Sequence, residues 1–407
     1  MKARPLRLVG LLSLVSFLGY PLRTNITVAA KTMMPDLGLT QVQMGNVFSS
    51  FQLFYALFQI PAGLLGDRYG ARRILTLALV IWAVSSIATG LVPASASIGL
   101  TIGTLYAARA LLGIGEAATY PVGGLVIQRH VPFGYRGRAT GLFISAAAAG
   151  SALTPPVIAW GMTAHGWRAT FVVAGLLALL VAVLWHRAAP PPERGPTTTE
   201  APGVVFRRSV ALLRDRHLLL LSVSYLLNGA VWFLFVYWFY LYLTDVRGFT
   251  VLAGGVFGAL PFLAAALIGP TGGVLVDALA PRRGVARARR TAAVFGLLGS
   301  ATCVVIGVQL ANPFLGIAAL SLSSALVNFV ESPFWTAAAE LGGEQAGLAC
   351  GVLNTFGNLG GVFSTFAVPR MVEAWGWTAT IATFAGVAVV AASLWFVIHP
   401  ARRAPGA

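Results

Sequence analysis

Long apolar stretches alternate along this 407-residue chain with short clusters of charged residues and with turns rich in Gly and Pro. A helix that crosses a bilayer needs about 20 mostly apolar residues, and the chain has room for twelve such stretches. The pattern therefore predicts an all-α membrane protein with twelve transmembrane helices. The predicted spans are 8–30, 46–66, 74–93, 98–128, 137–161 and 167–187, followed by 217–243, 251–277, 291–311, 313–338, 346–370 and 375–399.

A polar segment separates the first six spans from the last six. It contains the sequence PPPERGPTTTEAPG and then a basic stretch that ends at Arg216. Such a composition, rich in Pro, Thr and charge, is typical of a linker. We therefore predict an N-terminal six-helix bundle at 1–190, a cytoplasmic linker at 191–215 and a C-terminal six-helix bundle at 216–407.

The two halves carry an internal repeat. A shift of 210 residues brings ten marked positions into register without gaps. A parallel repeat of six helices relates the halves by an axis along the membrane normal, and it places the substrate site near the midplane between them. The pairs are Gly63/Gly273, Asp67/Asp277, Arg72/Arg282, Arg73/Arg283, Gly141/Gly351, Gly150/Gly360, Gly166/Gly376, Trp167/Trp377, Ala169/Ala379 and Thr170/Thr380.

Composition and charge argue against an ordinary soluble enzyme and against a nucleic-acid-binding protein. Hydrophobic residues make up 57% of the chain and charged residues only 10%, whereas an ordinary soluble domain has about 25% charged residues. The formal net charge of +16 is distributed unevenly, because 22 of the 28 Lys and Arg residues lie in the termini and alternate connections. This bias predicts an inner-membrane protein with both termini in the cytoplasm, and it does not indicate nucleic-acid binding.

The sequence gives no indication of enzyme chemistry, a metal or a cofactor. Cys303 and Cys350 lie inside apolar spans without a CxxC pattern or a His partner. The five histidines lie at predicted helix ends or in loops, so no nucleophile with a base and no metal cluster is expected. We expect a monomer whose partners are the lipid bilayer and a transported solute.

A specific motif follows the second span, where residues 63–73 read GLLGDRYGARR. It matches the G-x-x-x-D-R-x-G-R-R signature of the major facilitator superfamily, and a degenerate copy occupies 273–283. Glycines let helices approach closely, and a carboxylate at a helix end can pair with arginines as a latch that breaks when the halves rock. A basic turn without a gating role is the alternative. The gating residues predicted here are Gly63, Asp67, Arg68, Arg72, Arg73 and Asp277.

A closer resemblance covers nearly the whole chain. Its main features are RTNITVAA from Arg23, YALFQIPAG from Tyr55, RALLGIGE from Arg109 and NTFGNLGG from Asn354. These segments are similar to the anion:cation symporter branch of the superfamily, which includes galactonate and hexuronate transporters, sialin and the vesicular glutamate carriers. The resemblance implies proton-coupled symport, through alternating access, of a small organic anion such as a sugar acid or another carboxylate.

Four charged residues lie well inside predicted spans, away from the span ends, namely Arg23, Arg109, Glu116 and Glu331. A charge at the bilayer centre costs about 2.5–3.5 kcal/mol even on lenient scales, so such residues are candidates for function. Arg109 and Glu116 are seven residues apart and share one helix face. The resemblance makes Arg23 the substrate anchor and Glu116 a proton carrier whose protonation Arg109 modulates; Glu331 is a second proton-coupling candidate. Static ion pairs that hold helices together are the alternative.

One position departs from the resemblance. In the sugar-acid symporters an Asp precedes the arginine of the first helix and shares proton handling with the glutamate of the fourth, but here that position is Leu22. The sequence-based hypothesis is therefore coupling through Glu116 alone, with one proton per anion.

Polar and aromatic groups in other spans are candidates for the substrate shell. Packing between helices is the competing role for the aromatic residues, and hydrogen bonds between helices compete for the asparagines. With the two arginines, the predicted substrate-binding residues are Arg23, Tyr55, Arg109, Asn328, Trp335, Asn354 and Asn358.

Other functions remain open at this stage. An organophosphate or anion exchanger is weakly suggested by Gly19-Tyr20 and by Arg23 with Asn25, but residues 217–243 lack the second arginine of that family. A drug:proton antiporter is disfavoured by two arginines in the interior. A transporter-like receptor is the non-transport alternative.

Overall fold

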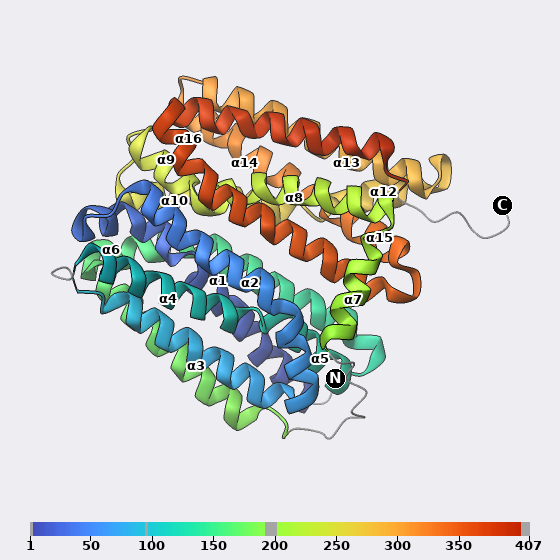
Figure 1. Ribbon diagram of the computed structural model, residues 1–407, viewed down its shortest axis with the longest axis horizontal. Coiled ribbons are helices and arrows are strands. Elements are labelled where there is room, and N and C mark those ends of the chain that lie inside the picture. Colours follow the sequence, from blue (N-terminus) through green and yellow to red (C-terminus); the bar gives the residue numbers. More distant parts are fainter. Residues whose placement is uncertain (1–2, 94–96, 192–201, 400–407) are drawn as a thin grey trace. The chain divides into compact units, whose positions relative to one another are not determined.

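The computed structural model describes residues 3–93, 97–191 and 202–399 (Figure 1). These residues form helices and connecting turns, with no strand in the described ranges. The α-helices are α1 (Ala3–Leu37), α2 (Gln41–Tyr69), α3 (Ala71–Gly90), α4 (Ile98–Glu116), α5 (Thr119–His130), α6 (Arg136–Ala188), α7 (Pro202–Leu212), α8 (Arg216–Tyr237), α9 (Phe239–Asp245), α10 (Val251–Gly258), α11 (Leu260–Ile268), α12 (Thr271–Arg283), α13 (Val285–Gln309), α14 (Pro313–Phe329), α15 (Glu331–Gly342) and α16 (Ala346–Val397). Short 3-10 turns lie at Phe133–Tyr135 and Gly343–Gln345.

Twelve spans are present once two very long helices are divided. Ten helical stretches of the described chain are long and apolar enough to cross a membrane, and α6 and α16 among them have 53 and 52 residues. Each of these two contains one non-helical glycine, Gly166 with φ 79° and Gly376 with φ 76°, at which the chain turns from one span to the next. Positive φ is readily adopted only by glycine. The prediction of an all-α membrane protein with twelve spans is confirmed.

The chain forms two compact units. Unit 1 comprises Met1–Pro202 and Tyr240–Ala259, and unit 2 comprises Gly203–Phe239 and Leu260–Ala407. The segment Tyr240–Ala259 joins unit 1 because α10 packs on α6. A Cβ on Gly255 of α10 would lie 2.5 Å from the Ala159 Cβ of α6, so glycine permits this contact. The division into 1–190, 191–215 and 216–407 stays a prediction.

Both units use glycine for a close approach between their first and fifth spans. In unit 1 a Cβ on Gly150 of α6 would lie 2.3 Å from the Phe17 carbonyl oxygen of α1. In unit 2 a Cβ on Gly360 of α16 would lie 2.0 Å from the Leu226 carbonyl oxygen of α8. Gly150 and Gly360 are partners in the 210-residue repeat, so the repeated sequence makes a repeated helix contact. Close backbone approach through small residues is a main source of packing energy in membranes.

Each unit has its own apolar core. The core of unit 1 includes the fully buried rings of Trp82 on α3 and Trp185 on α6. The core of unit 2 includes those of Phe334 on α15 and Trp395 on α16, which meet edge to face at a centroid distance of 5.1 Å. These rings hold the helices that carry the polar groups described below.

The fourth and tenth spans are each interrupted. Helix α4 ends at Glu116 and α5 begins at Thr119, while α14 ends at Phe329 and α15 begins at Glu331. A proline removes one N–H and clashes with the carbonyl four residues before it. Pro121 and Pro333 therefore disturb the helices close to residues 117 and 329, where the breaks lie. In both spans a glutamate stands beside the break.

The close contact at Gly360 gives a stability prediction. Gly360→Ala places a methyl group against the Leu226 carbonyl, and such overpacking costs about 1–3 kcal/mol. We expect a lower unfolding temperature in detergent micelles. Gly351→Ala is the matched control, because it lies on the same helix, gains the same helix propensity and meets nothing within 4 Å. Equal unfolding temperatures of the two variants would contradict the packing described here.

Candidate functional site

An ion pair between α1 and α4 lies inside unit 1. The Arg23 guanidinium contacts one carboxylate oxygen of Glu116, with Nη2 at 2.7 Å and Nε at 2.8 Å from Oε2. Arg23 is 7% exposed and Glu116 is 2% exposed. An ion pair is far stronger in such a medium than in water, and a lone charge there is costly. The structure thus brings together two of the charged residues that the sequence singled out.

Aromatic rings surround the Arg23 guanidinium. Its central carbon lies 4.4 Å from the ring centroid of Tyr55, 5.1 Å from that of Tyr20 and 5.3 Å from that of Phe51. Phe51 and Tyr55 stack one turn apart on α2. Cation–π contacts of this kind stabilise a partly desolvated guanidinium. Tyr55 was expected near the site; Tyr20 and Phe51 were missed, although the i, i+4 spacing of Phe51 and Tyr55 was visible in the sequence.

Arg109 ties α4 to α1. It is 1% exposed, and it donates from Nη1 to the Leu22 carbonyl oxygen and from Nη2 to Asn25 Oδ1, both at 3.2 Å. Its guanidinium also lies over the Phe171 ring of α6 at 5.4 Å. The backbone that it holds is that of the residue immediately before Arg23. Its position is therefore suited to fixing the first helix next to the ion pair.

The charges in the interior of unit 1 do not balance. Among the described residues of this unit, the buried charged side chains are Arg23, Arg109 and Glu116, two cations and one anion. The second carboxylate oxygen of Glu116, Oε1, is buried and has no hydrogen-bond partner in the described chain. A buried acceptor without a partner is uncommon and costs free energy. The cluster therefore has an excess positive charge and one open acceptor for a proton.

Unit 2 contains a carboxylate in a different setting. Glu331, the first residue of α15, accepts hydrogen bonds at Oε2 from Tyr225 Oη and Trp335 Nε1, both at 2.8 Å. Its Oε1 receives a long contact of 3.4 Å from Asn228 Nδ2. Within the described residues, Glu331 has no lysine, arginine or histidine nitrogen within 4.0 Å. Neutral donors alone hold this carboxylate.

The predicted asparagines form hydrogen bonds along their own helices. Asn328 Nδ2 donates to the Ser324 carbonyl at 3.0 Å, and Asn358 Nδ2 donates to the Asn354 carbonyl at 2.8 Å. These side chains stay predicted members of a substrate shell. Trp335 is a donor to Glu331, a role that the sequence did not indicate.

The signature motif lies at one end of unit 1. Asp67 Oδ1 is 3.1 Å from Nη2 of Arg129, in the last turn of α5, and both side chains are partly exposed. Gly63 permits the contact of α2 with α5, because a Cβ there would lie 3.2 Å from the Pro121 Cβ. Arg129 was missed, although a basic residue near a helix end is a usual partner for such a carboxylate. Arg68 lies over the Tyr69 ring, and Asp277 is exposed on α12.

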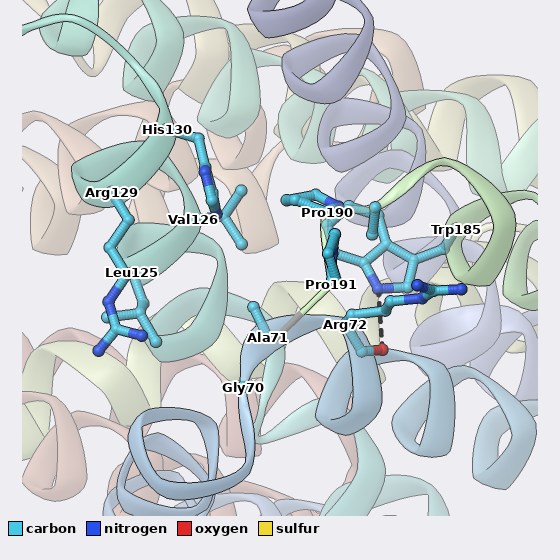
Figure 2. A pocket seen from close by; sticks show the side chains of 11 residues that line it. Gly70, Ala71, Arg72, Leu125, Val126, Arg129, His130, Trp185, Pro190 and Pro191 are labelled. Carbon is cyan, nitrogen blue, oxygen red and sulfur yellow. Dashed lines mark hydrogen bonds between the residues drawn. The ribbon is translucent and has the colours of Figure 1, made fainter. Parts of the chain in front are cut away.

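A cleft of about 350 Å³, its open mouth included, lies between the α2–α3 junction, α5 and the end of α6. Figure 2 shows that the side chains of Arg72 and Arg129 point away from each other there, with Val126 and two prolines between them. The Trp185 indole donates to the Arg72 carbonyl at 3.3 Å, the dashed contact in Figure 2. The guanidinium groups of Arg72 and Arg129 therefore do not converge on one point in this cleft (Figure 2).

A sequence model of the Major Facilitator Superfamily matches residues 12–365. The chain belongs to the major facilitator superfamily. It is accordingly a multi-pass membrane transport protein. The predicted resemblance to this superfamily is confirmed.

Relatives cover most of this major facilitator chain. It is 30% identical to a probable sulfoacetate transporter of Cupriavidus necator, over 91% of this chain and 87% of the relative. It is 28% identical to a probable galactarate/D-glucarate transporter of Bacillus subtilis, over 96% and 90%. It is also 28% identical to a D-galactonate transporter of Escherichia coli, over 91% and 90%.

Solved structures agree with the fold. A bacterial homologue of the human lysosomal transporter Spinster, crystallised in an inward-facing and occupied conformation, superposes with a TM-score of 0.85. The match covers 100% of both chains at 19% identity. At this identity the likeness supports the major facilitator fold alone.

The two arginines of the fourth span allow a matched test. Arg109→Gln removes the buried hydrogen bonds to Leu22 and Asn25, and bonds to charged groups contribute about 1.5–3 kcal/mol each. We expect a clear fall in the unfolding temperature of the detergent-solubilised protein. Arg129→Gln removes an exposed pair with Asp67, for which about 0–1 kcal/mol is typical. Equal shifts for both variants would show that Arg109 does not hold α1.

Proposed function

We propose that this protein carries a small organic anion, a sugar acid or another carboxylate, across the inner membrane together with protons, with both termini in the cytoplasm. The observation that carries the proposal is the excess positive charge inside unit 1, two arginines against one glutamate in its described part. A guanidinium in a water-poor site binds carboxylates through a planar fork of N–H donors. An interior of this charge favours an anionic solute over a cationic one.

The relatives support the class of solute. The three relatives described above are a probable sulfoacetate transporter, a probable galactarate/D-glucarate transporter and a D-galactonate transporter. A hexuronate transporter of Bacillus subtilis is 26% identical over 94% of this chain. Each of these solutes is an organic acid, and this agrees with an arginine anchor.

The ion pair suggests how anion and proton are coupled. A substrate carboxylate takes the place of Glu116 on the Arg23 guanidinium, and Glu116 accepts a proton at its open Oε1. The empty cluster has two positive charges and one negative charge; the loaded cluster has two guanidinium groups, a neutral Glu116 and one substrate carboxylate. The net charge of the cluster is the same in both states, so loading does not add an unpaired charge to the membrane interior.

Arg109 has a positioning role in this proposal. Its bonds to the Leu22 carbonyl and to Asn25 keep the backbone beside Arg23 in place while Arg23 exchanges Glu116 for the substrate. The gating residues Gly63, Asp67 and Arg68 lie away from this exchange, and we propose that the Asp67–Arg129 pair breaks and forms again as access alternates.

Arg23 as the anchor is tested by binding. Purified protein stabilised by D-galactonate, D-glucarate or sulfoacetate in a thermal-shift screen should lose that stabilisation in Arg23→Ala. Asp67→Asn, far from the anchor along the sequence and exposed, should retain it. Stabilisation by an acid that persists in Arg23→Ala would remove Arg23 as the anchor.

Glu116 as a coupling residue is tested by transport. In proteoliposomes, an inward proton gradient should drive accumulation of the labelled acid by the wild type. Glu116→Gln leaves Arg23 free for the anion but cannot take up a proton, so we expect retained anion exchange and at least a tenfold loss of gradient-driven accumulation. Unchanged accumulation by Glu116→Gln would overturn the coupling scheme.

A further inference from the structure

The Glu331 carboxylate occupies a prepared site in unit 2. It stands at the break between α14 and α15, where the first backbone N–H groups of α15 favour a negative charge. Its side chain keeps part of its surface exposed, whereas Tyr225 is 8% and Asn228 is 1% exposed. Two of the three donors therefore lie in the protein interior, while Glu331 and Trp335 are only partly buried.

Rigid packing holds the donors in place. The Tyr225 ring lies 5.0 Å from that of Phe334 and 6.3 Å from that of Trp335, centroid to centroid. On its other side, Gly357 of α16 leaves the necessary room, because a Cβ there would lie 2.5 Å from Tyr225 Cε1. The two bonds to Oε2 are thus fixed by side chains that cannot easily turn away.

The surroundings of Glu331 offer titratable groups but no opposite charge. Helix α15 packs against α8, α12, α13, α14 and α16. The titratable neighbours are Tyr225 of α8, which donates to Glu331, and Cys350 of α16, whose thiol lies 3.8 Å from the Trp335 carbonyl oxygen. Helix α14 contributes the amide of Asn328.

The charged residues of the same helices lie elsewhere. On α12, Asp277 is exposed, and on α13 Arg289 pairs with Glu340 of α15 itself. On α16, Arg370 donates to the Phe366 carbonyl and Glu373 is exposed. An ionised Glu331 is therefore not compensated by a cation in the described part of unit 2, unlike Glu116 in unit 1.

Asn228 can serve both protonation states of Glu331. Asn228 Nδ2 makes two long contacts of 3.4 Å, one to Glu331 Oε1 and one to the Val327 carbonyl oxygen. Asn228 Oδ1 is buried and has no hydrogen-bond partner in the described chain. Turning the amide by half a revolution exchanges oxygen and nitrogen. Oδ1 then faces Oε1 and accepts the hydrogen of a protonated carboxyl group. The turn gives up the long contact of Nδ2 with the Val327 carbonyl, and Oδ1 gains a partner only when Glu331 carries a proton.

The same contacts disfavour a metal cation such as sodium. Alkali cations are coordinated by oxygen lone pairs, but Trp335 Nε1 and Tyr225 Oη direct hydrogens at Glu331 Oε2. An indole nitrogen has no acceptor to offer. A proton on Oε1 keeps both short bonds to Oε2 intact.

We propose that Glu331 is a second proton-carrying site, loaded at Oε1 with Asn228 as the switching acceptor and separate from Glu116. The proton comes from the side of high proton concentration and leaves to the other side, and no other covalent bond changes. Its part in transport rests on the symport proposed above. With one proton on each glutamate, the stoichiometry is two protons per anion, in place of the one that Leu22 suggested.

The titration of Glu331 can be tested without any substrate, because Trp335 donates to its carboxylate. We expect a pH-dependent component of the tryptophan fluorescence of the purified protein that is absent in Glu331→Gln and in Trp335→Phe. Glu373→Gln, on an exposed residue of α16, should keep that component. Gln at position 331 imitates the protonated carboxyl group, so the variant should fold with an unchanged or higher unfolding temperature. A wild-type pH curve retained in Glu331→Gln would overturn the proposal.

Stoichiometry gives the second test, from reversal potentials in proteoliposomes with labelled D-galactonate. The wild type and Glu373→Gln should move two protons per anion and Glu331→Gln one. A stoichiometry that is unchanged in Glu331→Gln, with only a raised KM, would make Glu331 a substrate contact and refute the proposal. If the wild type does not couple galactonate to protons, the proposed function fails for this acid, and the fluorescence titration still decides whether Glu331 takes up a proton.

Discussion

A charge in the membrane interior must be compensated, and this constraint determines the arrangement of unit 1. Arg23 and Glu116 come from α1 and α4, and their contact fixes these two helices against each other. Arg109 adds a second connection through the Leu22 carbonyl and Asn25. Removing one partner of a buried pair leaves an uncompensated charge and costs about 3–5 kcal/mol. In the proposed mechanism a substrate carboxylate replaces Glu116, which takes up a proton, so the net charge is unchanged and the same constraint permits exchange of the anion.

Unit 2 meets the constraint by other means. Glu331 has no arginine among its described contacts, and it accepts hydrogen bonds from Tyr225, Trp335 and Asn228 instead. Donors of this kind reduce the cost of a buried charge without cancelling it. In the proposed mechanism both glutamates take up a proton, but only Glu116 must first release an arginine partner to the substrate anion. The two units thus place a glutamate beside a helix break and give it different partners, an arginine in unit 1 and neutral donors in unit 2.

Backbone features prepare both positions. Pro121 and Pro333 interrupt the fourth and tenth spans, and each break lies beside a glutamate. Irregular backbone at membrane depth is tolerated where protein groups or a cavity satisfy it. Glycines allow close packing between spans, since at Gly150 and Gly360 the backbones of two neighbouring helices come into contact. Close packing at these glycines leaves little freedom for the helices that carry Arg23 and Tyr225.

The sequence alone determined the fold. A span of about 20 apolar residues forms a helix in lipid, because its backbone groups must bond within the segment. The repeat then gives both halves the same close helix contact, at Gly150 and Gly360, and the same turn between spans, at Gly166 and Gly376. The sequence also identified Arg23, Arg109, Glu116 and Glu331, since charges are rare in apolar spans. It did not reveal that Arg23 pairs with Glu116, that Arg109 binds the Leu22 backbone, or that Asp67 pairs with Arg129. Tyr20 and Phe51 became site residues only in the structure. Partners depend on which helix faces meet and how side chains turn there, and these are decided by tertiary packing between residues far apart in the chain.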